Sequence, residues 1–327
     1  MVRNNIILVL LTIALVGLFA LDLCCGSVWL NLHDAISDQG VLHHIFLDIR
    51  LSKAITAILA GMALSISGLM MQTLFRNPLA GPYILGVSSG ASLGVALLTM
   101  LGGITLHSTL YTLHSTLSAA FAAVIGSAIV LLLMLLIARR IRSNVTLLIV
   151  GMMVGAIASA LVGVIQNFAD PDSLKLFIVW TLGSLQGVGW QELHYLLPIT
   201  IVGIIMAIGL VKPLNGLLLG EDYAQGLGIR VSSIRWAIVL ATGLLVGGIT
   251  AFCGPIAFVG VAVPHIARGL FRTTNHRLTL PACALIGANL LLVCDILSSL
   301  CTYPLPISTL SSLIGAPIII YVIIRNK

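Results

Sequence analysis

Apolar residues occur along this chain in runs long enough to cross a lipid bilayer. A transmembrane helix needs about 20 mainly apolar residues, and the pattern predicts a series of such helices separated by short polar stretches. One of the runs is shorter than the others and contains Pro264, which predicts a short or bent helix. The ten runs lie near residues 6–26, 52–72, 84–103, 115–138, 145–167, 192–211, 235–254, 256–271, 278–301 and 308–324.

Basic residues indicate which face of the membrane each loop occupies. Ten spans place both termini on one side, and of the 16 Lys and Arg residues only Arg50, Lys53 and Lys175 then fall on the other side. Cytoplasmic loops carry the excess of Lys and Arg, so we predict that both termini are cytoplasmic. Without the 256–271 helix, Arg268 and the basic residues that follow it would lie outside, so the charge pattern supports that helix.

The composition agrees with an all-α polytopic membrane protein. Hydrophobic residues make up 59% of the 327 and charged residues 8%, and the mean hydropathy is +1.15, which leaves too little polar surface for a soluble globule. No hydrophilic stretch is long enough for a separate domain, so we predict that residues 1–327 form a single transmembrane domain. The net charge of +6 follows from the basic cytoplasmic loops, and no basic domain points to nucleic acid.

Motifs of enzymes and cofactor sites are absent from the sequence. It has no G-x-x-x-x-G-K-[ST] phosphate loop, no H-E-x-x-H and no G-x-S-x-G, so we expect neither catalysis nor a cofactor in this chain. The six cysteines form no C-x-x-C pair, which favours packing over metal or disulfide roles. His33, His43 and His44 of the first outer loop fit either a metal or haem site or plain solvent exposure.

Ionisable residues inside the apolar runs are few. Asp295 is the clear case, and Asp22 and Glu192 lie near helix ends. Proton- and sodium-coupled carriers bind their ion at such buried acids, so one interpretation is an ion-coupled secondary transporter that uses Asp295. A hydrogen-bonding role for the same carboxyl group is the other interpretation. The scarcity of buried charge favours an energy source outside this chain.

Small residues recur at every fourth position in three of the predicted helices. Such a stripe removes side chains from one helix face and lets two backbones approach closely in lipid. The alternative is that some of these faces line a transport pathway. The stripes consist of Gly86, Gly90 and Gly94, then Gly151, Gly155, Ser159 and Gly163, then Gly243 and Gly247.

The longest inner segment, about 212–234, contains the only acidic residues on that basic face. The pair Glu221-Asp222 suits a helix N-terminus, where the helix dipole favours negative charge, and Gly228 suits a helix end. A short amphipathic helix at this position would fill a groove on a soluble partner, and an ordinary loop is the alternative. The side chains that such a helix would show to the partner are Tyr223, Ala224 and Leu227.

Three sequence blocks, in order along most of the chain, match one family pattern. The first contains Gln72, Asn77-Pro78-Leu79-Ala80 and Gly86-Val87-Ser88-Ser89-Gly90-Ala91. The second contains residues 220–228, Gly254–Gly260 and Val263–Arg268, and the third contains Gly315-Ala316-Pro317 with Ala288 and Asp295 upstream. Together they resemble the FecCD family of ABC importer permeases, whose members import iron-siderophores, haem or cobalamin.

The resemblance implies a transmembrane subunit of the bacterial cytoplasmic (inner) membrane that pairs with a second copy of the permease around a central pathway. Two cytoplasmic ATP-binding subunits would bind ATP and Mg²⁺ and drive alternating access, and an extracytoplasmic substrate-binding protein would deliver the substrate. The ATPase contact implied by the resemblance consists of Glu221, Asp222, Tyr223, Ala224, Gln225, Gly226, Leu227 and Gly228. The residues that we assign to the pathway or to helix packing are Gly86, Ser88, Ser89, Gly90 and Gly94.

The chain departs from the family pattern at its predicted outer face. The family carries R-L-P-R before the second span, and its arginines can pair with glutamates of the binding protein. Here Arg50 matches, but Ser52 replaces the proline and Lys53 the second arginine, which keeps the charge and loses the bidentate fork. The resemblance therefore implies docking at Arg50 and Lys53, and interfacial snorkelling of these side chains is the alternative.

Overall fold

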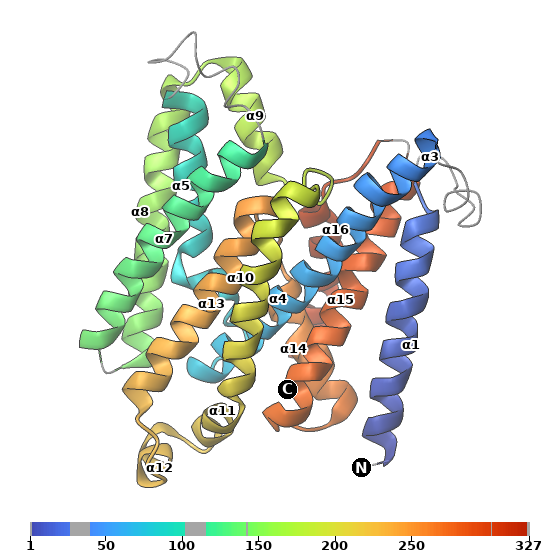
Figure 1. The fold of residues 1–327 in the computed structure, drawn as a ribbon. Helices are drawn as coiled ribbons and strands as arrows, with labels where there is room; N and C mark the ends of the chain where they lie inside the picture. The colour runs from blue at the N-terminus through green and yellow to red at the C-terminus, as the bar shows by residue number, and fades with distance from the viewer. Residues whose placement is uncertain (1, 27–39, 102–115, 142, 302, 326–327) are drawn as a thin grey trace.

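The computed structural model describes residues 2–26, 40–101, 116–141, 143–301 and 303–325, and the described chain is all helical (Figure 1). Within these described ranges, seven helices are long and apolar enough to cross a membrane, and three shorter apolar helices complete the ten predicted runs. The long helices are α1 (Val2–Cys24), α4 (Ser52–Leu74), α7 (Thr116–Arg140), α8 (Asn144–Phe168), α10 (Trp190–Gly209), α13 (Val231–Cys253) and α15 (His276–Leu300). The shorter ones are α5 (Val87–Ala96), α14 (Val259–Phe271) and α16 (Ile307–Arg325).

Short helical elements connect or extend these spans. A π-helical segment, η1, leads directly into α4, and α11 and α12 occupy the long inner segment that the sequence singled out. The short elements are α3 (Val41–His44), η1 (Ile45–Leu51), η2 (Pro82–Leu85), η3 (Leu97–Leu101), α9 (Pro171–Thr181), α11 (Val211–Leu218) and α12 (Glu221–Gly226).

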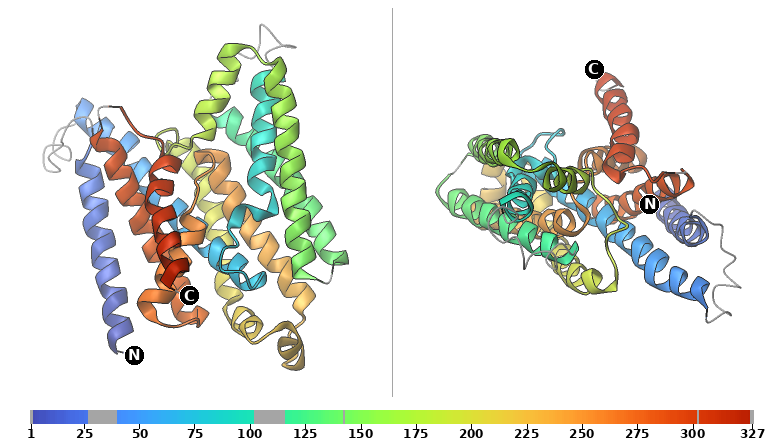
Figure 2. Two further views of the ribbon diagram at one scale, coloured as in Figure 1. Left: turned by 180° about the vertical axis from the view of Figure 1, so that it is seen from behind. Right: turned by 90° about the horizontal axis from the view of Figure 1, so that it is seen from above.

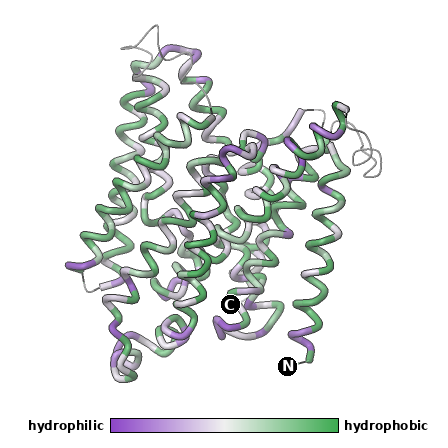
Figure 3. Tube along the Cα trace, in the orientation of Figure 1, coloured by the Kyte–Doolittle hydropathy of each residue, from purple (hydrophilic) through white to green (hydrophobic). Residues whose placement is uncertain are grey.

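The start of α1 and the end of α16 lie at the same end of the helix bundle as α12, and α3 and α9 lie at the opposite end (Figures 1 and 2). Polar residues gather at these two ends, while the helices between them are mostly hydrophobic (Figure 3). The prediction that the termini share a face with the 212–234 segment is therefore confirmed, and with it the short span that became α14.

Helix α4 lies at the centre of the bundle. In the apolar 18-residue stretch of this helix, 83% of the residues are buried within the protein. The corresponding share is 78% for α13, 67% for α15, 22% for α8 and 11% for α1. Helices α10, α13, α14 and α15 all pack against α4. The exposed apolar side chains of α1 and α8 are compatible with lipid, because a bilayer solvates apolar surface that water would not.

Glycines allow the tightest of these helix contacts. A Cβ added to Gly94 would lie 2.1 Å from the carbonyl oxygen of Ala122, and one added to Gly90 would lie 2.6 Å from that of Gly126. Helix α5 therefore packs on α7 backbone to backbone, as small residues permit in membranes. Gly86 packs in the same way, with a Cβ only 3.0 Å from the backbone nitrogen of Gly155 on α8.

The chain between α13 and α14 is not helical, although it lies between two apolar spans. Its backbone groups are satisfied by side chains of other elements: the Tyr83 hydroxyl donates to the carbonyl of Ile256 (2.5 Å) and accepts from its N–H (3.0 Å), and Ser311 donates to the carbonyl of Ala257 (2.9 Å). Irregular backbone at membrane depth requires such protein partners. This explains why the run predicted at 256–271 forms only a short helix.

Candidate functional site

Helix α12 projects from the inner end of the bundle and exposes apolar side chains. It follows Gly220, whose φ of +119° strongly favours glycine. Tyr223 and Leu227 are each 59% exposed, as predicted for a partner-facing surface. Ala224 is fully buried, so its predicted exposure is wrong: its side chain turns inward under the helix, toward Gly216.

Glu221 faces the bundle and anchors α12 to it. Its carboxylate accepts a hydrogen bond from the Asn144 amide and lies 3.4 Å from the guanidinium of Arg235. Arg235 also donates to the carbonyl of Ile141 (2.7 Å), and Asn144 donates to that of Leu74 (2.7 Å). These contacts tie the start of α12 to α13, α8 and the end of α4. Sequence reasoning missed Arg235 as the partner of this acid.

A second polar network joins α11 to α15 and α4. Nδ1 of His276 lies 2.9 Å from the Asn215 side-chain oxygen, which only accepts, so Nδ1 carries the proton and Nε2 accepts from the Thr73 hydroxyl (2.9 Å). The His276 backbone N–H also donates to Asn215 (2.8 Å). Beside it, Arg268 donates to Gln72. The segment that carries α12 is thus linked to α4, the central helix of the bundle, through His276 of α15.

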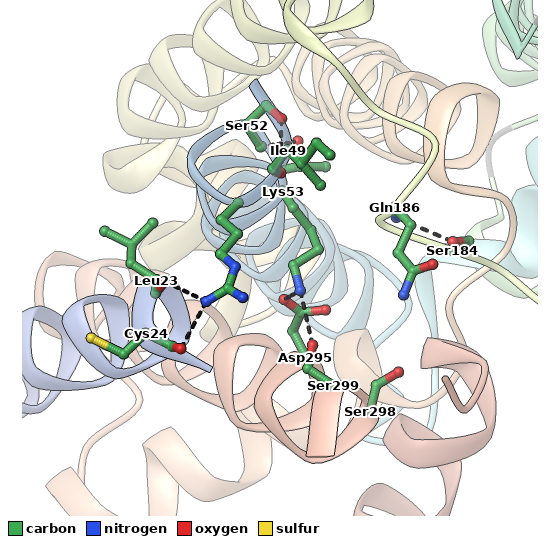
Figure 4. Close-up of polar contacts among 12 residues, drawn as sticks. Leu23, Cys24, Ile49, Ser52, Lys53, Ser184, Gln186, Asp295, Ser298 and Ser299 are labelled. Carbon is green, nitrogen blue, oxygen red and sulfur yellow. Dashed lines mark hydrogen bonds and ion pairs between the residues drawn. The ribbon is translucent and has the colours of Figure 1, made fainter. Parts of the chain in front are cut away.

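The predicted docking pair, Arg50 and Lys53, lies at the outer end of α4, but both residues are only 6% exposed. The Arg50 guanidinium donates to the carbonyls of Leu23 (3.0 Å) and Cys24 (2.7 Å), which close the C-terminus of α1 (Figure 4). A cation is favourable there because a helix C-terminus carries partial negative charge. Neither snorkelling nor an outward-facing docking pair describes the position of Arg50 in this structure.

Asp295 is not an isolated buried acid. Its carboxylate lies 2.9 Å from Nζ of Lys53, which also donates to the Ser299 hydroxyl at 2.9 Å (Figure 4). The side chains of the two charged residues are 8% and 2% exposed. The ion pair joins α4 to α15. This is a structural role, and it is closer to the hydrogen-bonding interpretation of Asp295 than to the ion-coupling one.

Removing only one charge of this pair should destabilise the protein. In a Lys53→Met variant the Asp295 carboxylate stays buried without its counter-charge, at a cost of about 3–5 kcal/mol. We expect a clear fall in the thermal unfolding midpoint of the purified protein, with much of it recovered in Lys53→Met/Asp295→Asn. Lys175→Met removes an exposed cation and serves as the control. An unchanged midpoint in Lys53→Met would contradict the assignment.

Among the residues that the structure describes, two of the hollows lie near the outer half of the bundle, and the sequence pointed to neither. One, of about 240 Å³, lies beside Asp295 and is lined in part by Ser184, Gln186 and Ser298. The other, of about 590 Å³, lies between the end of α9 and α16. Its lining residues are Thr181, Leu182, Ser308, Thr309, Ser312, Leu313, Ala316 and Pro317.

The residues assigned to the pathway or to packing are in packing positions. Gly86, Gly90 and Gly94 meet α7 and α8 as described above, Ser88 is buried, and Ser89 is half-buried beside Gly155. None of these five lines either hollow. The hydroxyl side chains of Ser308, Thr309 and Ser312 in the last predicted span are the sequence feature that could have indicated the larger hollow.

The outer-loop histidines give no metal site in the part of the chain that the structure describes. His43 and His44 lie on α3, and His44 contacts Asp48 at 3.1 Å. His33 lies outside the described residues. Among the described residues, no group of three His, Cys, Asp or Glu side chains is placed to hold a metal ion.

Comparisons with known proteins agree with this architecture. Residues 11–325 match the model of the FecCD transport family. The chain is 35% identical to the hemin transport system permease protein HmuU of Yersinia pestis, covering 98% of this chain and 94% of that protein. It is 36% identical to the vitamin B12 import system permease protein BtuC of Shigella boydii, covering 99% and 97%.

A solved structure extends the likeness to three dimensions. It is described as an inward-facing conformation of a metal-chelate type ABC transporter, with a TM-score of 0.87 and 30% identity over 98% of this chain and 99% of that one. Fold, helix order and sequence therefore agree over nearly the whole length. The chain belongs to the FecCD transport family and is the multi-pass inner-membrane permease subunit of a bacterial ABC importer, whose ATPase is a separate protein.

Proposed function

We propose that this permease imports a metal chelate, of the iron-siderophore, haem or cobalamin class, as a homodimer driven by two ATPase subunits. The substrate class is supported by the hemin and vitamin B12 permeases that the chain resembles over at least 98% of its length. These substrates share a large size and a metal enclosed by its ligands. Such a cargo needs a wide pathway and few strong protein ligands.

The exposed apolar face of α12 is the single observation that carries the proposed coupling to an ATPase. Tyr223 and Leu227 stand out at the inner end of the bundle, and both are 59% exposed. An apolar helix face of this kind binds by insertion into a groove. The Glu221 anchor would pass a displacement of α12 on to α13 and α8.

The larger hollow is our candidate for part of the substrate pathway. It combines Ser308, Thr309 and Ser312 with apolar neighbours on one face of α16. Polar groups on a membrane helix usually face protein or a water-filled cavity, so we propose that a second copy of the chain covers this face and encloses the hollow. A bland, hydroxyl-lined surface would let a chelate pass without trapping it.

Docking of the binding protein at Arg50 and Lys53 remains our proposal for the outer face. To bind Lys53, an acidic residue of the partner would have to take the place of Asp295. To bind Arg50, it would have to take the place of the α1 carbonyls. Docking and the packing of α1, α4 and α15 would then depend on each other.

Uptake by proteoliposomes tests the proposal. The permease, reconstituted with its ATPase subunit and supplied with its binding protein, should accumulate one of a ferric siderophore, haem or cobalamin. Accumulation should require ATP on the ATPase side, and omission of the ATPase is the control. Uptake that persists without the ATPase and is lost in Asp295→Asn would instead identify an ion-coupled carrier.

A further inference from the structure

The turn that ends α4 places an arginine where glycine is usually found. The N–H of Asn77 donates to the carbonyl of Gln72 (3.2 Å), and the N–H of Arg76 donates to that of Thr73 (3.3 Å). These two hydrogen bonds form a Schellman motif, which closes a helix with a residue in the left-handed conformation. That residue is Arg76, whose φ is +49°. A residue with a Cβ is strained in this conformation, and glycine is not.

The Arg76 side chain makes no contact that would compensate for this strain. It is exposed, and among the described residues its guanidinium has no hydrogen-bond or ion-pair partner. The preference for basic residues in cytoplasmic loops explains a cation on this face of the protein, but not at a strained position. Arg272, at the end of α14, has the same conformation, with a φ of +51°, so the conformation alone does not assign a function to Arg76.

The position of Arg76 beside α12 sets it apart. Its Nη2 lies 3.5 Å, and its Nη1 3.9 Å, from the point where a Cβ on Gly220 would be. Gly220 is the residue directly before α12. The first acid of that helix, Glu221, is engaged by Arg235 and Asn144. The guanidinium therefore lies next to the start of α12 with its N–H donors available to another molecule.

Helix α12 is too small to hold a soluble subunit by itself. Specific protein–protein interfaces bury about 800 Å² on each partner, from about 20–30 residues, whereas α12 has 6 residues. The surface around it must therefore contribute to any stable complex. The helix rises about 9 Å, at about 1.5 Å per residue, so Arg76 beside its start and Leu227 beyond its end can contact the same partner. Arginine is enriched at protein interfaces.

We propose that Arg76 belongs to the ATPase-binding surface and pairs with a carboxylate of the ATPase, at the rim of the groove that receives Tyr223 and Leu227. The inference rests on the proposed coupling through α12 and adds the turn after α4 as a second contact. A guanidinium can bind a carboxylate through two parallel hydrogen bonds. The ATPase then holds both α12 and the inner end of α4, the central helix of the bundle.

Arg76→Gly separates the strain at this residue from its contact with the partner. Glycine is the usual residue at this position of the motif, so the thermal unfolding midpoint of the full-length permease in detergent should be no lower than that of the wild type. Its affinity for the purified ATPase subunit, measured by biolayer interferometry, should fall about tenfold, as for an important interface residue. Arg272→Gly is the matched control, because it removes the same charge from the same backbone conformation. It should keep the wild-type affinity.

The dependence of binding on salt is a readout that relief of strain would not change. Salt screens exposed charges, so the wild-type affinity should fall steeply as the ionic strength rises, and the affinity of Arg76→Gly should fall less. Arg76→Lys keeps the charge and should retain most of the affinity. Arg76→Glu should bind more weakly than Arg76→Gly, because like charges across an interface repel each other.

Leu227→Arg distinguishes failure of this inference from failure of the coupling proposal. If Leu227→Arg loses the ATPase while Arg76→Gly keeps the wild-type affinity and salt dependence, α12 stays in the interface and Arg76 does not belong to it. Equal losses in Arg76→Gly and Arg272→Gly would also overturn the inference, since the overall charge of this face would account for both. Wild-type binding by Leu227→Arg would overturn the coupling proposal, and the assignment of Arg76 with it.

Discussion

A Leu227→Arg permease should fold normally and lose its ATPase. Leu227 is 59% exposed at the end of α12, so its replacement leaves the bundle intact. In the complex, the arginine would be buried in an apolar groove without a partner. Truncation of a central interface residue costs about 2 kcal/mol or more, and a buried unpaired charge costs more still. We expect the ATPase to be lost on affinity purification and uptake to fall to background.

The control for this variant is Tyr303→Arg, which makes the same kind of change at the opposite end of the protein. Tyr303 is 83% exposed in the loop after α15, and its variant should retain the ATPase. Glu221→Lys is a useful contrast, because that side chain holds α12 to Arg235 and Asn144. Glu221→Lys should lower the unfolding temperature of the permease and also weaken its coupling to the ATPase. A Leu227→Arg protein that still copurifies the ATPase would remove α12 from the interface.

Features that depend on one stretch of chain could be predicted from the sequence. The ten helices follow from apolar runs of the right length, and the side of each loop follows from the bias of Lys and Arg. Even the short α14 could be predicted, because its omission would have placed Arg268 on the wrong side. The position of α12 followed from Glu221-Asp222 at its start and Gly228 at its end.

The direction of individual charged side chains could not be predicted in this way. Lys53 turns inward because Asp295 and Ser299 lie at the same depth, 246 residues from it in the case of Ser299. Glu221 turns inward because α8 supplies Asn144 and α13 supplies Arg235. These partners come from helices whose neighbours are decided by packing, which residue spacing along one helix does not encode.

Polar contacts along the length of α4 hold α4 and α15 together as one unit. At the inner end Thr73 contacts His276, at the outer end Lys53 pairs with Asp295, and between them Ser65 donates to the carbonyl of Cys283 (2.8 Å). Helix α12 packs on α11, whose Asn215 contacts His276 of α15. Rigid elements of this kind carry hinge and shear motions with little internal change.

Gly68→Ala should prevent the normal packing of α4 on α14, with the largest effect on folding that we expect from a single methyl group. The new Cβ would lie 1.7 Å from the carbonyl oxygen of Gly260 on α14, and backbone cannot yield as the end of a flexible side chain can. Alanine gains about 1 kcal/mol over glycine in a helix, but overpacking costs about 1–3 kcal/mol or more, so the clash wins.

The matched control is Gly163→Ala on α8, where a Cβ meets nothing within 4 Å. Both glycines lie inside transmembrane helices, so both variants gain the same helix propensity and differ only in the contact. We expect a well-folded, monodisperse Gly163→Ala protein, and a sharply reduced yield and unfolding temperature for Gly68→Ala, measured by size-exclusion chromatography and a thermal ramp. Equal stability of the two variants would show that α4 and α14 can separate without cost. The close contact between Gly68 and Gly260 would then not be a requirement of the stable fold.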